Sequence, residues 1–200
     1  NDNGSFPYLR SHPLTTQRIA DMQQRHQLET STPASTAPDL AHAMVAARAR
    51  VLANRAGDVE RLWLAEPATA GFAAQEASRR AAALYAAALI SLRQREFERA
   101  RGFLARLHEV VQGHPAAQRQ ARLLAAELEL AAGAPLRAQD ILAGDPASAG
   151  WAGKLRRPEL VLKTQAQLAQ GPRGTVEGAG GSMADALQTW LATHPKDATV

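Results

Sequence analysis

Residues 79–115, RRAAALYAAALISLRQREFERARGFLARLHEVVQGHP, decide the fold of this chain. Apolar residues recur there at three- and four-residue steps, the spacing that places side chains on one face of an α-helix. The first run consists of Ala81, Leu84, Ala88 and Leu92, and the second of Phe97, Ala100, Leu104, Leu107 and Val111. A polar turn separates the runs, and His114-Pro115 is expected to end the second helix. Small alanines among the leucines let two helices approach closely, so the pattern predicts an antiparallel helical hairpin.

The composition of the whole chain also favours helices. Good helix formers such as alanine, leucine and arginine are abundant, whereas aromatic residues make up only 4% of the chain and β-branched residues are sparse. One hairpin cannot bury its own apolar face, so neighbouring hairpins must cover one another. We therefore expect an all-α protein of antiparallel helical hairpins stacked as a short solenoid.

Helix-breaking residues divide the chain into segments. Residues 29–38, ETSTPASTAP, are small, polar and proline-containing, which is typical of a flexible linker, and we place the main domain boundary there. A glycine-rich loop is expected over residues 174–182. Further helices are expected over residues 14–27, 40–54, 59–65, 116–132, 158–170 and 183–193, with another from Pro135 to just before Asp145.

A repeated pattern links three successive hairpins. An alanine in each second helix is followed four residues later by a large apolar residue, and the pairs are Ala100–Leu104, Ala138–Leu142 and Ala186–Trp190. The alanines are 38 and 48 residues apart, whereas a tetratricopeptide repeat has a period of 34. The pattern resembles degenerate tetratricopeptide repeats, because in each unit the alanine lets one helix press against its partner.

The chain is basic, with a formal net charge of +4 and a pI near 10.1. One interpretation is a surface for an acidic partner, nucleic acid or anionic lipid. The other, which we favour, is that the arginines form the solvated outer faces of the helices. Lysines and aromatic residues for base stacking are scarce, so no nucleic-acid partner is expected. The 79–115 hairpin alone carries seven arginines against three glutamates, the arginines being residues 79, 80, 93, 95, 99, 101 and 106.

The segment 8–22, YLRSHPLTTQRIADM, carries a resemblance to a known family. A Ser-His-Pro followed by threonine, and then Arg18-Ile19, is similar to the end of the protease domain in M48-type zinc metalloendopeptidases, including periplasmic members with C-terminal tetratricopeptide repeats. Residues 39–54 and the 79–115 hairpin resemble the opening of that repeat array. The resemblance implies a protease-domain tail over residues 1–28, the linker over 29–38 and the repeat domain over 39–200. It also implies part of a longer protein in the periplasm of a Gram-negative bacterium.

The zinc motif of such proteases is absent from this sequence. They bind zinc through His-Glu-x-x-His, whose glutamate is the general base. The six histidines here, residues 12, 26, 42, 108, 114 and 194, do not pair in that way, and there is no cysteine. We therefore expect no catalytic residue, metal ligand or cofactor in this chain, and zinc in the parent protein. In the family the loop around His12 lies close to the zinc cleft, so the resemblance implies a zinc-proximal histidine. The alternative is a simple turn before a helix.

The resemblance implies a protein–protein interaction module that binds substrates or outer-membrane assembly partners. Stacked helical hairpins form a groove suited to extended or helical peptides. The candidate groove residues are polar or aromatic residues on the first helices of hairpins: Arg80, Tyr85, Arg122 and Glu129. A stand-alone adaptor without a protease is the second hypothesis, and a basic nucleic-acid-binding helical domain is the third. No apolar run is long enough to span a bilayer, so any association with the outer membrane is expected through partners.

Overall fold

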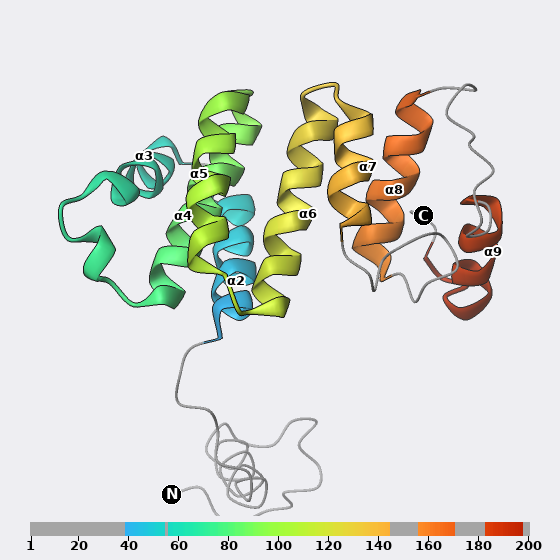
Figure 1. Cartoon of the computed structure of the whole chain (residues 1–200), viewed down its shortest axis with the longest axis horizontal. Helices are drawn as coiled ribbons and strands as arrows, with labels where there is room; N and C mark the ends of the chain where they lie inside the picture. The colour runs from blue at the N-terminus through green and yellow to red at the C-terminus, as the bar shows by residue number, and fades with distance from the viewer. Residues whose placement is uncertain (1–38, 55, 145–155, 171–182, 198–200) are drawn as a thin grey trace, which may run out of the picture. The chain divides into compact units, whose positions relative to one another are not determined.

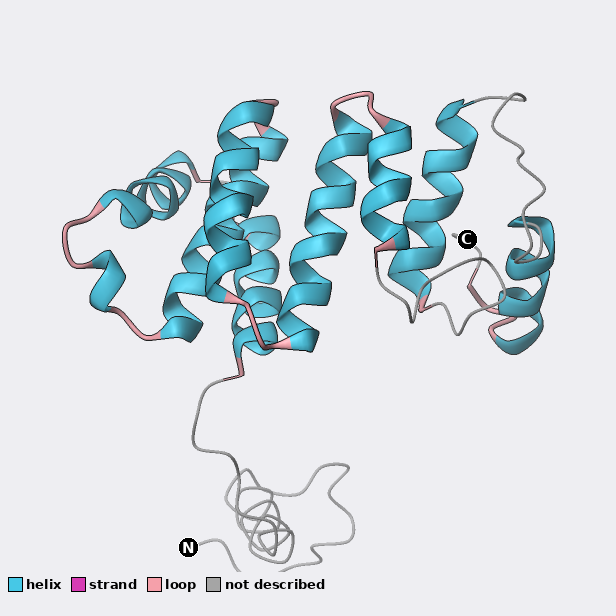
Figure 2. Cartoon of the chain, in the orientation of Figure 1, coloured by secondary structure: helices cyan, strands magenta, loops and turns pink. Residues whose placement is uncertain are grey.

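The computed structural model describes residues 39–54, 56–144, 156–170 and 183–197. The chain divides into two compact units, residues 1–37 and 38–200, and every described residue belongs to the second. The described residues form helices and no strand (Figure 2), so this part of the protein is all-α, as predicted. The helix expected at 14–27, the linker at 29–38 and the loop at 174–182 lie outside the described residues, as does His12.

Eight α-helices and two short 3-10 helices follow one another in the described part of the chain (Figure 1). The α-helices are α2 (Leu40–Ala53), α3 (Gly57–Ala65), α4 (Ala77–Arg93), α5 (Phe97–Val110), α6 (Pro115–Ala131), α7 (Pro135–Ala143), α8 (Arg157–Gln170) and α9 (Met183–Thr193). The 3-10 helices η2 (Glu66–Ala68) and η3 (Phe72–Ala74), between α3 and α4, were not predicted. α5 ends at Val110, before His114-Pro115, as the sequence predicts. Pro115 begins α6, where its missing N–H needs no partner.

Two antiparallel hairpins form the centre of this unit. α4 packs against α5, and α6 packs against α7. In Figure 1, α2, α4, α6 and α8 run in one direction, and α5 and α7 run in the opposite direction. α2 contacts both α4 and α6, and the guanidinium of Arg93, at the end of α4, donates to the carbonyl of Val51, near the end of α2, at 3.1 Å. α2 thus lies parallel to α4, and the segment α3–η2–η3 connects the two.

Helix α4 is the most deeply buried helix of the described residues. Every residue from Ala81 to Ser91 is buried, because α2, α3, α5 and α6 all pack against this helix. A helix that is apolar on all sides is expected in the interior of a protein. Ala47 of α2 and Ala100 of α5 are also fully buried. Small side chains at these positions allow the helix backbones to approach one another closely.

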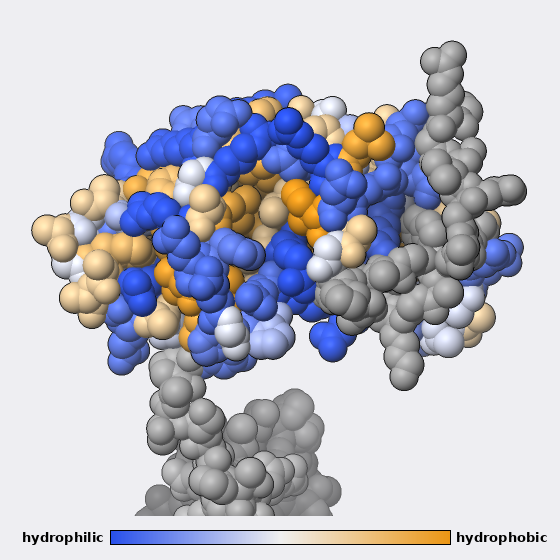
Figure 3. Space-filling model, viewed as in Figure 1, coloured by the Kyte–Doolittle hydropathy of each residue, from blue (hydrophilic) through white to orange (hydrophobic). Residues whose placement is uncertain are grey.

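Helix α6 is shared by two apolar clusters. Its residues Ala117, Ala121 and Leu124 belong to the larger cluster, with residues of α2, α3, η3, α4 and α5. The smaller cluster consists of Leu123 and Ala126 of α6, Ala138 and Leu142 of α7, and Leu162 and Ala166 of α8. Hydrophilic residues cover much of the face seen in Figure 3, and apolar residues gather between them near its middle. The two sides of α6 therefore join one hairpin to the next.

The turn from α4 to α5 is a Schellman motif. The Glu96 N–H donates to the Ser91 carbonyl at 2.9 Å, and the Arg95 N–H donates to the Leu92 carbonyl at 3.0 Å. This motif requires a left-handed residue after the helix, and Arg95 has a φ of 61°. A residue with a Cβ is strained in that conformation, so arginine stands here where glycine is usual.

The turn from α6 to α7 repeats this geometry. The Ala134 N–H donates to the Glu129 carbonyl at 2.8 Å, and the Gly133 N–H donates to the Leu130 carbonyl at 3.1 Å. Gly133 has a φ of 75° and is the equivalent of Arg95. The two residues are 38 residues apart, which is the interval predicted from Ala100 and Ala138.

The two turns provide a matched pair of substitutions. Arg95→Gly is expected to raise the free energy of unfolding by about 0.5–1 kcal/mol, because glycine removes the steric cost of the positive φ. Gly133→Ala should lower it by about 1 kcal/mol. Nothing lies within 4 Å of a Cβ added at Gly133, so the backbone conformation alone causes the loss. Urea unfolding, followed by circular dichroism, measures both changes in the free energy of unfolding. Changes of the same sign would contradict the shared geometry of the two turns.

Candidate functional site

The four candidate groove residues lie on two helices. Arg80 and Tyr85 belong to α4, and Arg122 and Glu129 belong to α6. Tyr85 is only 2% exposed and Glu129 only 6%, whereas the two arginines are half-buried. Within the described residues, the Nε atom of Arg80 is buried without a hydrogen-bond partner. In this structure the two arginines are therefore exposed enough to contact a partner directly, whereas Tyr85 and Glu129 are not. Partner binding by these residues stays a prediction.

Tyr85 belongs to a polar cluster that joins three helices. The Arg48 guanidinium of α2 donates to the Tyr85 hydroxyl of α4 at 3.2 Å and to the Glu127 carboxylate of α6 at 3.0 Å. A second nitrogen of Arg48 lies 2.9 Å from the other Glu127 oxygen, so this ion pair is bidentate. Burial raises the pKa of the Tyr85 hydroxyl, although the charge and hydrogen bond of Arg48 act in the opposite direction. This cluster holds α2 against α4 and α6.

Glu129 belongs to a second polar cluster, on α5, α6 and α7. The Arg101 guanidinium of α5 donates to both Glu129 oxygens, at 2.8 and 2.9 Å, and to Glu98 at 2.6 Å. Arg137 of α7 lies 4.0 Å from Glu129. The hydrogen bond from Arg101 lowers the pKa of Glu129, while burial opposes this shift. The ionised carboxylate therefore links the second helix of one hairpin to the first helix of the next.

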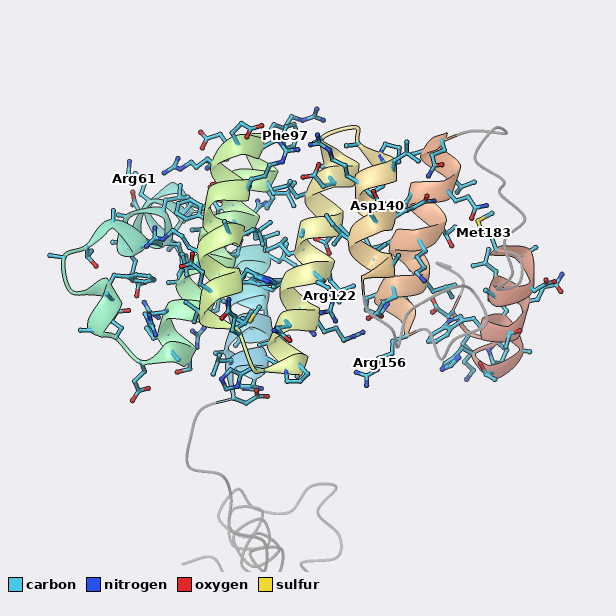
Figure 4. All side chains as sticks on the ribbon, viewed as in Figure 1. Arg61, Phe97, Arg122, Asp140, Arg156 and Met183 are labelled. Carbon is cyan, nitrogen blue, oxygen red and sulfur yellow. The ribbon has the colours of Figure 1, made fainter. Side chains whose placement is uncertain are left out.

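The structure does not bring the four candidates together at one site. Glu127 and Glu129 are two residues apart on α6, so they point to different sides of the helix, one toward α2 and the other toward α5. Arg122 is seven residues before Glu129 and shares its side of α6. Figure 4 shows Arg122 on the lower half of α6. Tyr85 and Glu129 thus belong to different polar clusters, on different sides of α6.

A third ion pair, which was not predicted, joins α6 to α8. Arg119 donates to Glu159 at 2.6 Å, and its Nε atom lies 2.5 Å from the other carboxylate oxygen. Glu159 is 3% exposed, so Arg119 replaces water as the partner of its carboxylate. The pairs from α6 to α5, α8 and α2 join residues 28, 40 and 79 positions apart, respectively. Helical spacing within one segment contains no signal for partners at such separations.

Two arginines of the 79–115 hairpin hold the segment between α3 and α4. Arg79 donates to both oxygens of Glu66 in η2, each at 2.6 Å. Arg106 of α5 donates to the Pro67 carbonyl at 2.8 Å. Each guanidinium also lies over an aromatic ring, at 5.0 Å from the centre of Trp63 for Arg79 and 5.4 Å from that of Phe72 for Arg106.

The arginines of this hairpin are therefore more than solvated outer faces. Arg93 lies 3.4 Å from Glu60 of α3, in addition to its bond to Val51. Arg99 and Glu96 form an exposed ion pair at 2.9 Å, which fits the interpretation of the arginines as solvated outer faces of the helices. Most of the arginines that suggested a nucleic-acid surface therefore contact neighbouring carboxylates or carbonyl oxygens.

The described residues contain no group of three or more histidines, aspartates or glutamates that could hold a metal ion. None of the helices in the described ranges is long and apolar enough to cross a membrane. Comparisons with protein-family models, curated proteins and solved structures find no match for this chain. The family resemblance of residues 8–22 therefore stays a prediction.

The buried phenol gives a prediction for alkaline pH. Because the pKa of Tyr85 is raised in the folded protein, its contribution to stability is complete below the unfolded pKa of about 10 and is lost as pH rises through the folded value. In a Tyr8→Phe variant the only remaining tyrosine is Tyr85, and its ultraviolet titration is expected to lie above pH 10. Tyr85→Phe should lower the free energy of unfolding by about 1 kcal/mol at neutral pH. At alkaline pH the variant should lose less stability than the protein with Tyr85. A titration of Tyr85 at the ordinary phenol pKa of about 10 would contradict its burial.

Proposed function

We propose that this chain is the protein–protein interaction module of a zinc metalloprotease, and that it binds substrates or outer-membrane assembly partners in the periplasm of a Gram-negative bacterium. The observation that carries this proposal is the stack of helical hairpins, α4–α5 and α6–α7, flanked by α2 and α8. Stacks of this kind offer extended surfaces to peptides and proteins. The link to a protease rests on the resemblance of residues 8–22.

The ion pairs between helices support a binding role. Arg101–Glu129, Arg119–Glu159 and Arg48–Glu127 each fix the position of one helix relative to α6. A surface that is ordered before binding loses less conformational entropy when a partner docks. A stack fixed in this way presents its exposed side chains in constant positions.

The gene upstream of this chain tests the link to a protease. A His-Glu-x-x-His motif is expected within about two hundred preceding codons. An upstream frame without that motif would exclude the zinc protease. If partner binding were retained in that case, the chain would be a stand-alone adaptor, which is the alternative function.

The purified chain is expected to be helical, free of stoichiometric zinc and inactive on casein. The reason is that the sequence contains no His-Glu-x-x-His, the motif that supplies two zinc ligands and the general base. Elemental analysis and a casein assay measure the two properties. Hydrolysis that a chelator abolishes would overturn the assignment of this chain as a non-catalytic module.

A photo-crosslinking residue at position 122 tests partner binding in the full-length protein in cells. Arg122 is half-buried and shares with Glu129 the side of α6 that faces α5. A crosslink from position 122 to a defined substrate or envelope protein is expected. The matched control is position 61 on α3, where the Arg61 side chain is 79% exposed. Identical products from both positions, or none from either, would count against the proposal.

A further inference from the structure

Helix α9 is packed less tightly than the other α-helices of the described residues. None of its residues is buried, whereas each of the others has at least one buried residue. Ala100 and Ala138 are fully buried in the first two hairpins, but the corresponding Ala186 of α9 is only half-buried, and Leu191 is 40% exposed. α9 contacts α8, yet burial of apolar area contributes little to this contact. The third hairpin of the predicted pattern is therefore not packed like the first two.

A carboxylate just after α9 joins this helix to the start of α8. The Arg157 guanidinium of α8 donates to both Asp197 oxygens, at 2.6 and 3.1 Å. The indole N–H of Trp190 in α9 donates to one of the same oxygens at 3.1 Å. The bidentate geometry fixes the orientation of the two charged groups as well as their distance. Asp197 thus connects residues of both helices.

Local contacts after α9 position this carboxylate. The His194 N–H donates to the Trp190 carbonyl at 2.8 Å, and the Asp197 N–H donates to the His194 carbonyl at 3.0 Å. The ring of His194 stacks on that of Trp190, with 3.9 Å between the ring centres and 8° between the planes. These contacts lie within residues 190–197, so they hold Asp197 close to α9 and present it to Arg157.

The start of α8 is fixed independently of α9. Arg119 of α6 contacts both oxygens of Glu159, two residues after Arg157, and these side chains are 19% and 4% exposed. Leu162 and Ala166 of α8 belong to the smaller apolar cluster with α6 and α7. α8 therefore has a buried ion pair and apolar packing of its own, whereas the pair that reaches α9 is at the surface.

We infer that the Arg157–Asp197 ion pair is a salt-sensitive latch, which holds α9 against α8 when it is formed and releases α9 from α8 when it is broken. The inference concerns the end of the helical stack and does not depend on the proposed function. The Arg157 side chain is 46% exposed and that of Asp197 is 17% exposed, so dissolved ions reach the pair. The screening length falls from about 8 Å at physiological ionic strength to about 3 Å at about 1 M salt.

Spin labels on α8 and α9 test the latch. The chain has no cysteine, so cysteines introduced at the exposed positions Gln165 of α8 and Gln188 of α9 carry the only labels. Pulsed electron resonance measures the distances between them. One main distance is expected at low salt, and high salt should add a longer-distance population. Asp197→Asn keeps an acceptor for Trp190 but removes the charge, and it should raise the longer-distance population up to about fivefold.

The neighbouring arginine provides a matched control. Arg157→Met should act like Asp197→Asn. Arg156→Met should leave the distances unchanged, because Arg156 is exposed and has no ion pair within the described residues. Equal effects of the two arginine variants would show a general effect of charge and overturn the inference. Distances that do not respond to Asp197→Asn or to salt would also overturn it.

Urea unfolding separates a latch from a pair that stabilises the whole stack. The main transition, followed by circular dichroism, is expected at the same urea concentration in Asp197→Asn and in the unchanged chain. The reason is that α8 stays attached to α6 through Glu159 and the smaller apolar cluster. A shift of the main transition as large as that of Arg119→Met would overturn the inference, since the pair would then belong to the packed core.

Discussion

Arg119→Met is expected to lower the free energy of unfolding by about 3 kcal/mol. The substitution leaves the Glu159 carboxylate, which is 3% exposed, without the guanidinium that contacts both of its oxygens. A buried charge without a partner costs about 3–5 kcal/mol. The Arg119 side chain is 19% exposed, so water reaches part of the site and the lower end of this range applies. Urea unfolding at neutral pH, followed by circular dichroism, measures the loss.

Two controls show whether burial causes this loss. Arg99→Met removes an arginine that is 46% exposed and paired with Glu96, and it is expected to cost less than about 0.5 kcal/mol. The double variant Arg119→Met with Glu159→Leu removes both charges and should recover most of the stability lost in the single variant. If Arg119→Met were no less stable than Arg99→Met, burial of the Arg119–Glu159 pair would not make it more important for stability than an exposed pair.

The helices themselves could be predicted from the sequence because their signals are local. Apolar residues at steps of three and four identify each helix, and prolines and glycines mark its ends. The 38-residue interval between Ala100 and Ala138 also separates the turns at Arg95 and Gly133, which share one geometry. These features depend on residues a few positions apart, so one sequence contains them.

The arrangement of the candidate site could not be predicted in the same way. The choice of Tyr85 assumed that α4 faces an open groove, but α2 lies against α4 and Arg48 reaches the Tyr85 hydroxyl. One signal was present in the sequence. From Ala81 to Ile90, α4 carries no charged residue on any side, which is typical of a helix covered on more than one face.

The charged residues of α6 contained a second signal. In the run Glu127-Leu128-Glu129, successive residues of a helix point about 100° apart, so the two glutamates face different neighbours across a buried leucine. Carboxylates at the border of an apolar face are most stable when a cation from another helix reaches them. That reasoning predicts inter-helix pairs for both residues. It does not identify Arg48 and Arg101 as their partners, because those assignments depend on how the helices pack.

Leu124→Ala is expected to lower the free energy of unfolding by about 2–5 kcal/mol, because it leaves a cavity beside α4. Leu124 is fully buried and belongs to the larger apolar cluster. Leu136→Ala is the matched control, since Leu136 is 64% exposed on α7 and its truncation should cost less than about 0.5 kcal/mol. Because α6 also carries the smaller cluster, loss of its packing on α4 should destabilise α7 and α8 as well. The variant is therefore expected to unfold in one transition at lower urea, and two separate transitions would show that α6 does not couple the two clusters.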